Sequence, residues 1–372
     1  MREVIDHRLV RRIDWRLLAF VAAILAISWP TIYSAMLGFD STAAWHYAQR
    51  QLLYAAIGAV FMVLVNTIDH HQLAGLSRPI YWASVLFLVV VLVVGREVNG
   101  AKSWLGVGMF RLQPSEFAKI AVIIALARLF SEAETDAGEW RTLFQSAAVL
   151  AAPLLLILAQ PDLGTSLTFI AVWLVLLWWA GARWWQLALI VMLGLAAFAL
   201  MWKLDILADY QKSRITVLFD PGADPRGQGY NLRQSLIAVG SGGWSGQGWL
   251  QGTQTHLRFL PERHTDFIFA VLCEEWGFVG AITLLLLYLG LVWRGLLIVL
   301  RADSSFGRLV ALGCVTVILL HVLLNVGMVI GLLPITGLPL PFFSYGGSNL
   351  LTSLVLVGLL LNVGMRRGGI NF

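Results

Sequence analysis

The sequence predicts an all-α polytopic membrane protein, and two observations carry this prediction. Of the 372 residues, 59% are hydrophobic and only 13% are charged, and the mean hydropathy is +0.78. Apolar runs of about twenty residues, the length of a helix that crosses the hydrocarbon core of a bilayer, recur along the chain. Because no water is available in that core, the backbone has to satisfy its own hydrogen bonds, which favours α-helices.

Ten such runs predict ten transmembrane helices in a single integral membrane domain, residues 1–372. The runs cover approximately residues 15–36, 47–68, 79–95, 114–131, 142–160, 163–181, 184–203, 266–300, 308–331 and 344–365. An even number of crossings places both termini on one side, and the flanking arginines assign that side to the cytoplasm. These arginines are Arg2, Arg8, Arg11, Arg12, Arg16, Arg366 and Arg367. The eighth run exceeds one crossing, so we expect it to tilt or to project beyond the bilayer.

Several classes of protein are disfavoured by the remaining composition. The two cysteines, Cys273 and Cys314, lie far apart in apolar runs, which indicates packing residues and not a metal site or a disulfide framework. The net charge of +5 comes from basic residues scattered over loops, which does not suggest a nucleic-acid partner. The first apolar run is too long for the hydrophobic region of a cleavable signal peptide.

A long polar segment, residues 204–265, separates the seventh and eighth spans and is expected on the extracytoplasmic side. Glycine and proline are dense in 220–227 and 240–249, which favours a turn-rich loop over a long helix. Residues 230–239 are compatible with a helix that ends at Gly240. A loop of this length is typically a lid, a docking surface or part of a site. A plain linker is the alternative, which its tryptophans disfavour.

The densest group of charges lies between residues 258 and 275, where seven ionisable side chains interrupt an apolar chain. Charge at a membrane is costly and is rarely kept without a partner or a task. Asp266 is either a plain cap of the eighth helix, together with Thr265, or a general base whose pKa is tuned upward. Glu274 and Glu275 lie deeper on the helix and must pair inside the bundle or mark a cavity.

A second group of polar residues precedes the fourth span. Pro114 is a favourable first helical residue, and Glu116 and Lys119 share a helix face, so they can form an ion pair. Alternatively, Lys119, with Arg111 or Lys102, holds a pyrophosphate at the start of the helix.

Two further segments are expected on the same side of the membrane. Asp162 lies in a tight turn, where it either caps the sixth helix or joins a site. Residues 334–348 contain three prolines and three glycines around aromatic residues. Such irregular backbone is tolerated near membrane depth only where protein or a water-filled cavity surrounds it.

Four of these segments resemble the SEDS family (shape, elongation, division, sporulation), most closely its RodA-like, cell-elongation branch. They are Phe-Leu-Pro-Glu-Arg-His-Thr-Asp-Phe-Ile-Phe-Ala (259–270), Gln-Pro-Ser-Glu-Phe-Ala-Lys (113–119), Gln-Pro-Asp-Leu-Gly-Thr (160–165) and Gly-Leu-Pro-Leu-Pro-Phe-Phe-Ser-Tyr-Gly-Gly-Ser (337–348). The resemblance covers most of the chain in the expected order. The short segment before the first span also suits the elongation branch better than the division branch.

The resemblance implies a ten-helix peptidoglycan glycosyltransferase that polymerises lipid II outside the bacterial cytoplasmic membrane. Asp266 matches the essential aspartate of the family and would accept the proton of the acceptor sugar hydroxyl, while Glu116 and Lys119 match a functionally important pair. The undecaprenyl pyrophosphate leaving group needs cationic stabilisation. The expected substrate-binding residues are Glu116, Lys119, Arg111, Asp162, Arg50, Glu262, Arg263 and His264. A single base without a second carboxylate nucleophile favours inversion at the anomeric carbon.

The resemblance also implies a partner, a class B penicillin-binding protein with transpeptidase activity, beside the membrane lipids. Its membrane helix would pack on the late spans, where Gly327, Gly331, Gly358 and Gly364 allow close approach, although these glycines could serve internal packing alone. No cofactor is required by the spacing of the residues, but a divalent cation could bridge the pyrophosphate and a carboxylate. A lipid flippase or transporter, and a non-catalytic scaffold of the wall-elongation complex, are the alternative functions.

Overall fold

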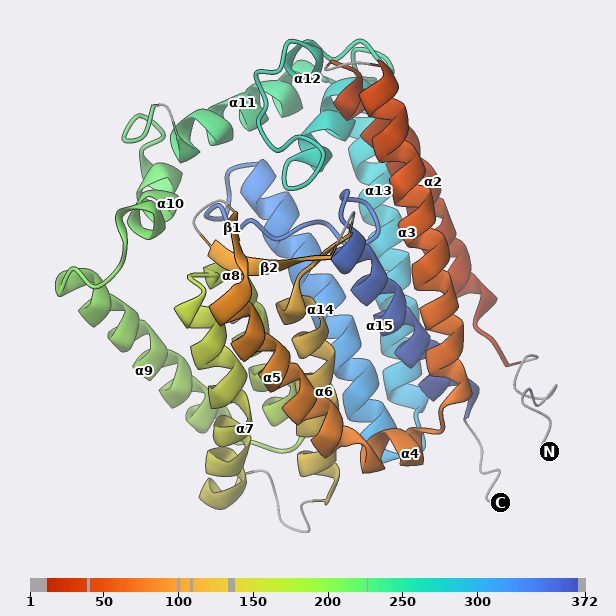
Figure 1. Ribbon diagram of the computed structural model, residues 1–372, viewed down its shortest axis with the longest axis vertical. Helices are drawn as coiled ribbons and strands as arrows, with labels where there is room; N and C mark the ends of the chain where they lie inside the picture. The colour runs from red at the N-terminus through yellow and green to blue at the C-terminus, as the bar shows by residue number, and fades with distance from the viewer. Residues whose placement is uncertain are drawn as a thin grey trace.

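The computed structural model describes residues 12–38, 41–98, 101–107, 110–132, 138–225 and 227–366. Within these ranges the chain forms fourteen helices and one three-stranded sheet (Figure 1). The helices are α2 (Trp15–Leu37), α3 (Ser41–Thr67), α4 (His70–Gly75), α5 (Ser77–Val94), α6 (Pro114–Glu132), α7 (Trp140–Ala159), α8 (Leu163–Trp179), α9 (Trp184–Lys203), α10 (Asp209–Phe219), α11 (Gln228–Ser241), α12 (Thr253–His256), α13 (Ile268–Arg301), α14 (Ser305–Val329) and α15 (Gly347–Met365). The prediction of a predominantly helical membrane protein is therefore confirmed.

Each predicted apolar run coincides with one long helix. In the described part of the chain, eight helices are long and apolar enough to cross a membrane, namely α2, α3, α5, α7, α9, α13, α14 and α15. Helix α8 is apolar but has 17 residues, and α6 carries Glu116, Lys119, Arg128 and Glu132 among its 19 residues. Pro114 is the first residue of α6, as predicted.

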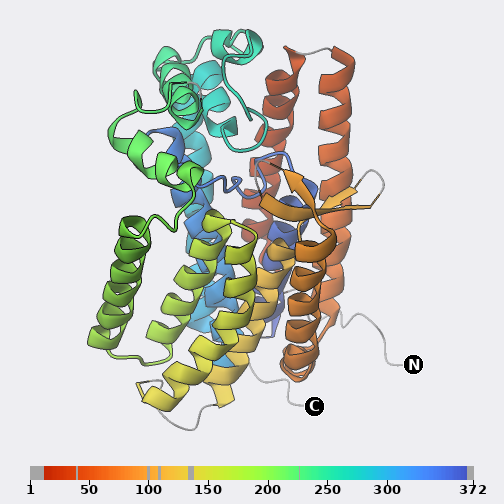
Figure 2. The same cartoon turned by 60° about the vertical axis from the view of Figure 1, so that its left-hand side comes forward.

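The all-α prediction is wrong for the segment between α5 and α6, which folds as a small antiparallel sheet. Strands β1 (Arg96–Val98), β2 (Ala101–Val107) and β3 (Phe110–Leu112) are hydrogen-bonded in the order β1-β2-β3, with Leu105 paired to Leu112. Pairing between these short strands satisfies backbone groups of a connection that continues neither helix. The sheet lies across the ends of α5 and α6 (Figure 2).

The eighth run is not one straight helix. Its backbone leaves the helical region at Gly277 (φ 63°, ψ −159°), so α13 consists of two helical parts joined by a kink. The glycine-rich turn that follows α11 is hydrogen-bonded to this kink: Gln247 N–H donates to Glu274 O at 2.9 Å, and Phe278 N–H donates to Gly243 O at 2.9 Å. A left-handed φ at the kink and the close approach of this turn both require glycine.

The polar segment 204–265 is folded onto one end of the bundle and is not a plain linker. It contains α10, α11 and α12, and the predicted helix 230–239 lies within α11, whereas α10 was not predicted. Ser235 Oγ donates to Val329 O at 2.8 Å. Glu274 accepts from the backbone N–H groups of Gln254 at 2.6 Å and Thr255 at 3.1 Å, so its predicted pairing is confirmed.

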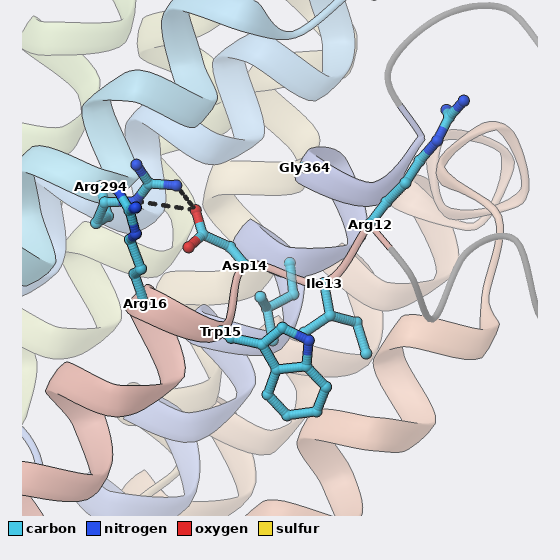
Figure 3. A pocket seen from close by; sticks show the side chains of 8 residues that line it. Arg12, Ile13, Asp14, Trp15, Arg16, Arg294 and Gly364 are labelled. Atoms are coloured by element: carbon cyan, nitrogen blue, oxygen red, sulfur yellow. Dashed lines mark hydrogen bonds and ion pairs between the residues drawn. The ribbon is translucent and has the colours of Figure 1, made fainter.

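The other end of the bundle holds the start of α2 and the end of α15 (Figure 1). Arg294 Nη2 lies 2.5 Å from Asp14 Oδ2 and joins α13 to the residue that caps α2. Arg12, Ile13, Trp15 and Arg16 line a cavity of about 300 Å³ beside this ion pair (Figure 3), together with Asp14, Arg294, Leu361 and Gly364. Both chain ends of the described bundle thus lie on the side opposite to segment 204–265.

Candidate functional site

The residues between α14 and α15, numbers 330–346, have no regular structure, and yet all of them except Leu332 are at least partly buried. Their carbonyl groups are satisfied by polar side chains from the surrounding helices. The donors to Leu338 O, Pro341 O, Phe343 O and Ser344 O are respectively Asn325 at 2.8 Å, Tyr288, Ser28 at 2.6 Å and Gln51 at 3.2 Å. Irregular backbone in an apolar bundle requires such partners, and we call residues 330–346 the central segment.

The central segment contacts the other three segments that carry the family resemblance. Tyr345 N–H donates to His264 O at 2.9 Å, and Ser344 Oγ donates to Thr265 O at 2.7 Å. A side chain at Gly164 would collide with Thr336 O. Just beyond the central segment, Ser348 Oγ accepts from Gln113 N–H at 3.0 Å. The four segments, far apart in the sequence, therefore meet at one place.

Asp266 lies at this meeting point, just before α13. The helix begins at Ile268 with Phe267 as its N-cap, so neither Thr265 nor Asp266 caps it. Asn325 Nδ2 donates both to Asp266 O and to Leu338 O, each at 2.8 Å, and thereby fixes the backbone that carries the carboxylate. A Cβ atom on Gly337 would lie 3.6 Å from Asp266 Oδ2, so the absence of a side chain leaves room beside the carboxylate.

The environment of Asp266 opposes its ionisation. The pKa of this carboxyl is raised to about 7, chiefly by burial and also by the negative charges of Glu262 and Asp162, while Arg214 acts to lower it. The residue nevertheless keeps partial solvent access. A carboxyl group that exchanges its proton near neutral pH, at a partly open position, has the properties of a general base.

Helix α10 brings a cation to the same place. Arg214 Nη1 donates to Thr336 O at 3.4 Å, and the guanidinium carbon lies 5.7 Å from the centre of the Tyr210 ring. Tyr210 in turn donates its hydroxyl hydrogen to Pro161 O at 3.0 Å. The polar segment 204–265 therefore contributes residues to the meeting point of the four segments.

Glu116 and Lys119 form a buried ion pair below this site. Lys119 Nζ lies 2.8 Å from Glu116 Oε1, and both residues are 2% exposed. The same Nζ lies 3.2 Å from His321 Nε2, and His321 Nδ1 lies 3.3 Å from Pro339 O. Of the two sequence interpretations, these contacts match the ion pair. Glu116 and Lys119 are paired and buried, and Lys119 is connected through His321 to the central segment.

Asp162 is the N-cap of α8, which was one of its two predicted roles. Its carboxylate accepts from Thr165 N–H at 3.0 Å and from Thr165 Oγ1 at 2.8 Å. It also accepts from Gln113 Nε2 at 3.3 Å, which joins the segments that begin α6 and α8. The same carboxylate is close enough to Asp266 to raise its pKa.

Two other predicted residues, His264 and Arg50, lie beside an aromatic group, and a third, Glu262, lies nearby in the sequence. The ring of His264 is 5.3 Å from that of Tyr47 and 5.7 Å from that of Tyr345, and burial lowers the pKa of His264, so the imidazole is neutral at pH 7. Exposed Arg50 hydrogen-bonds Tyr345. Glu262 is exposed, and its carboxylate accepts from Thr265 Oγ1 at 3.1 Å.

The two remaining predicted residues are placed differently. Arg263 is 2% exposed, and its Nη1 donates to Thr255 O at 2.5 Å, so it holds α12 in place. Arg111 lies in β3 opposite Gly106, and its side chain is outside the described residues. Lys102 lies in β2, and its side chain is likewise outside the described residues.

The sequence interpretation missed Arg214, His321 and Asn325. His321 and Asn325 are four positions apart on an otherwise apolar run, and polar residues in such runs are a signal of internal partners. Arg214 carries a weaker signal because it stands among other charged residues of a polar loop. Within the described residues no group of three or more His, Cys, Asp or Glu side chains is arranged to hold a metal ion.

The comparison with known proteins identifies the family. A model of the cell cycle protein family of FtsW, RodA and SpoVE matches residues 11–368. The chain belongs to this family. It is 40% identical over 355 residues to the peptidoglycan glycosyltransferase MrdB of Escherichia coli (strain K12), a match that covers 95% of this chain and 94% of that protein.

Members of the family with solved structures have the same fold. The crystal structure of the rod shape determining protein RodA of Thermus thermophilus is similar with a TM-score of 0.71 and 32% identity, covering 96% of this chain and 98% of the other. A chain of a peptidoglycan synthase complex that coordinates polymerization and crosslinking is similar with a TM-score of 0.81 and 33% identity, covering 95% and 97%. The family resemblance expected from the four segments is confirmed.

Proposed function

We propose that this protein polymerises lipid II into glycan strands at the outer face of the cytoplasmic membrane during cell elongation, with Asp266 as the general base. It is a peptidoglycan glycosyltransferase embedded in the inner membrane, like the relatives that it matches over nearly its whole length. The observation that carries the catalytic assignment is the partly open carboxyl of Asp266, whose pKa is raised to about 7 where the four segments meet.

The proposed orientation follows from the arrangement of the bundle. Ten crossings by α2, α3, α5–α9 and α13–α15 would place both ends of the described bundle in the cytoplasm, with Arg12, Arg16 and Arg294 at that end. Segment 204–265 and Asp266 would then face outward. The polyprenyl chain of lipid II can remain among the lipids while its sugars and pyrophosphate reach the polar end of the bundle.

The reaction requires one base and a stabilised leaving group. Asp266 accepts the proton of the acceptor sugar hydroxyl as that oxygen forms a bond to the anomeric carbon of the donor. The bond between this carbon and the undecaprenyl pyrophosphate breaks at the same time, and the pyrophosphate leaves with the electron pair. Attack from the face opposite the leaving group inverts the anomeric carbon, as expected for one catalytic carboxylate that does not form a glycosyl-enzyme intermediate.

The other residues divide into two groups in this proposal. Arg50, Glu262 and His264 bind the substrate at the exposed rim, where they surround Tyr345 or approach Asp266. Glu116 and Lys119 act from below by holding the central segment through His321. Asp162 contributes both its cap of α8 and its negative charge near the base.

The proposed partner is a class B penicillin-binding protein that cross-links the new glycan. Support comes from the similar chain in a peptidoglycan synthase complex. Two glycines that were considered for this interface serve packing within the chain instead: Gly358 faces the backbone of Met62 on α3, and Gly327 faces Leu333. The proposed interface therefore does not rest on these two glycines.

Labelled lipid II incubated with the purified protein and its transpeptidase partner tests the function. Glycan strands made by the wild type and lost in Asp266→Ala, with unchanged thermal unfolding, support the enzyme and its base. Lipid translocation without polymer in the wild type would instead indicate a flippase. Absence of both activities, in a sample that binds its partner, would indicate a scaffold.

A further inference from the structure

Arg214 is held at the site by weak contacts that leave part of its guanidinium unused. Its Nη1 hydrogen bond to Thr336 O is long, at 3.4 Å, and its Nε is buried without a hydrogen-bond partner. A guanidinium has five N–H donors in a planar fork, and a buried donor without an acceptor is costly. The position is therefore suited to an additional acceptor that a ligand supplies.

Arg214 and Asp266 both approach Gly337. A Cβ atom on Gly337 would be 3.6 Å from Asp266 Oδ2 and 4.0 Å from Arg214 Nη2. Gly337 has a positive φ of 72°, a backbone angle that residues other than glycine rarely adopt. The glycine therefore lies next to both a carboxylate that can accept a proton and a permanent cation, with no side chain of its own between them and a ligand.

Two of the cations that the sequence suggested for the leaving group are engaged with the protein. Lys119 is buried and paired with Glu116, and Arg263 is buried and donates to Thr255 O. Arg214, in contrast, is partly exposed and belongs to the segment that lies over the site. Bidentate hydrogen bonding makes arginine well matched to phosphate oxygens.

We propose that Arg214 binds the pyrophosphate of the donor lipid next to Asp266 and stabilises the undecaprenyl pyrophosphate as it leaves. This inference rests on the proposed glycosyl transfer. As the bond from the anomeric carbon to the pyrophosphate oxygen breaks, negative charge grows on that oxygen, and the guanidinium neutralises it without transferring a proton. The proton of the acceptor hydroxyl goes to Asp266. Helix α10 thereby gives segment 204–265 a part in the reaction itself.

The kinetic test compares Arg214→Ala and Arg214→Lys with Lys212→Ala in the lipid II polymerisation assay. Lys212 stands on the same helix and pairs with Asp205, so its removal controls for a lost cation of α10. We expect about a 100-fold fall in kcat/KM for Arg214→Ala, the scale for removal of one preorganised group that stabilises transition-state charge. Arg214→Lys should recover part of the loss, and Lys212→Ala should keep the wild-type rate.

A binding test separates contact with the pyrophosphate from support of the fold. Inorganic pyrophosphate should inhibit the wild type and Lys212→Ala, and it should inhibit Arg214→Ala at least tenfold less strongly. Equal inhibition of all three would overturn the inference. The inference would also be overturned if the loss of rate in Arg214→Ala were explained by an equal loss of folded protein, seen as a lower thermal unfolding temperature.

Failure of the inference can be told apart from failure of the proposed function. If the wild type makes glycan, Asp266→Ala makes none and Arg214→Ala is as fast as the wild type, the function stands and Arg214 has no part in it. If the wild type makes no glycan with its partner present, the proposed function itself fails.

Discussion

The chain holds two polar regions with opposite properties. Around Glu116 and Lys119 the charges are enclosed and paired, with side chains 3% and 1% exposed, and His321 extends the network to Pro339 O. Around Asp266 the carboxylate forms no hydrogen bond within the described residues, and its electrostatic neighbours Glu262 and Arg214 are reached by solvent. In the first region the charged groups form their hydrogen bonds with the protein, whereas in the second the carboxylate of Asp266 has none with the described residues.

This difference shows how one membrane bundle can hold charged residues that stabilise the fold apart from charged residues that are available for a reaction. A buried pair contributes little net stability, but the loss of one partner leaves an uncompensated charge and is strongly destabilising. A partly exposed carboxyl with a raised pKa can be changed at small structural cost, yet it can be essential to the reaction. The two regions should therefore respond to substitution in opposite ways.

Asp266→Asn should have the largest effect on the rate and a small effect on stability. The amide keeps the shape of the side chain but cannot accept a proton, so we expect polymerisation to fall by about 10²- to 10⁴-fold. The assay is the rate of glycan formation from labelled lipid II, with thermal unfolding measured in the same detergent. Asp209→Asn, an exposed acid at the start of α10, is the matched control. A variant Asp266→Asn with more than a tenth of the wild-type rate would contradict the assignment of the base.

Glu116→Gln and Lys119→Met should each have a large effect on stability, in contrast to Asp266→Asn. Each leaves a buried charge without its partner, and the free energy of unfolding should fall by about 3 to 5 kcal/mol. The double variant has no uncompensated charge, so most of this stability should return. Activity should stay low in the double variant, because the polar contact from Lys119 to His321 is still missing. Full activity in the stable double variant would show that the pair only supports the fold.

Asn325→Ala should give a smaller, mixed effect. The amide donates to Asp266 O and to Leu338 O, so its loss should lower stability by about 1 to 3 kcal/mol and lower kcat by about tenfold with little change in KM. Asn362 is a matched control, because its amide donates to Val65 O and Ile68 O at 2.8 and 2.7 Å near the other end of the bundle. Asn362→Ala should lose similar stability and keep its kcat. Equal kcat values in the two variants would show that Asn325 does not position the base.

The sequence was sufficient to predict the ten long apolar helices and to single out Asp266 as a candidate base, because apolar run length and the exceptional charges are local signals. It also predicted Pro114 as the start of α6 and Asp162 as a candidate cap. It could not predict the sheet 96–112 or the kink at Gly277. Both depend on contacts with distant residues, such as the turn at Gly243 that bonds to the kink.

The site was only partly predictable for the same reason. The Glu116–Lys119 pair was visible from its spacing on one helix, but its burial depends on α14 and the central segment. Arg214 was not visible, since nothing in the polar loop distinguishes it from Lys212 beside it. Its position becomes meaningful only when α10 is folded against Thr336 and Gly337.

The pH dependence of the reaction should show the smallest effect and the most specific one. Because the base must be ionised, kcat/KM should rise with pH and level off above about pH 7, following the raised pKa of Asp266. The charges facing this group are those of Glu262, Asp162 and Arg214. Removing the negative charge in Glu262→Gln makes ionisation easier, so the rise should move to lower pH. Relative to the plateau of the same variant, the rate near neutrality should gain up to about twofold.

Arg214→Ala removes a positive charge near the same carboxyl, so its rise should move to higher pH. Glu139→Gln, at an exposed acid that precedes α7, should leave the profile unchanged. The shift caused by Glu262 should shrink at high salt, because ions screen the interaction of an exposed charge. A profile that stays the same in Glu262→Gln and Arg214→Ala would mean that the titrating group is not Asp266. If the pH profile moves in opposite directions in the two variants, the titrating group is the carboxyl of Asp266, because this carboxyl faces both substituted charges. The enclosed Glu116–Lys119 pair would not give this response.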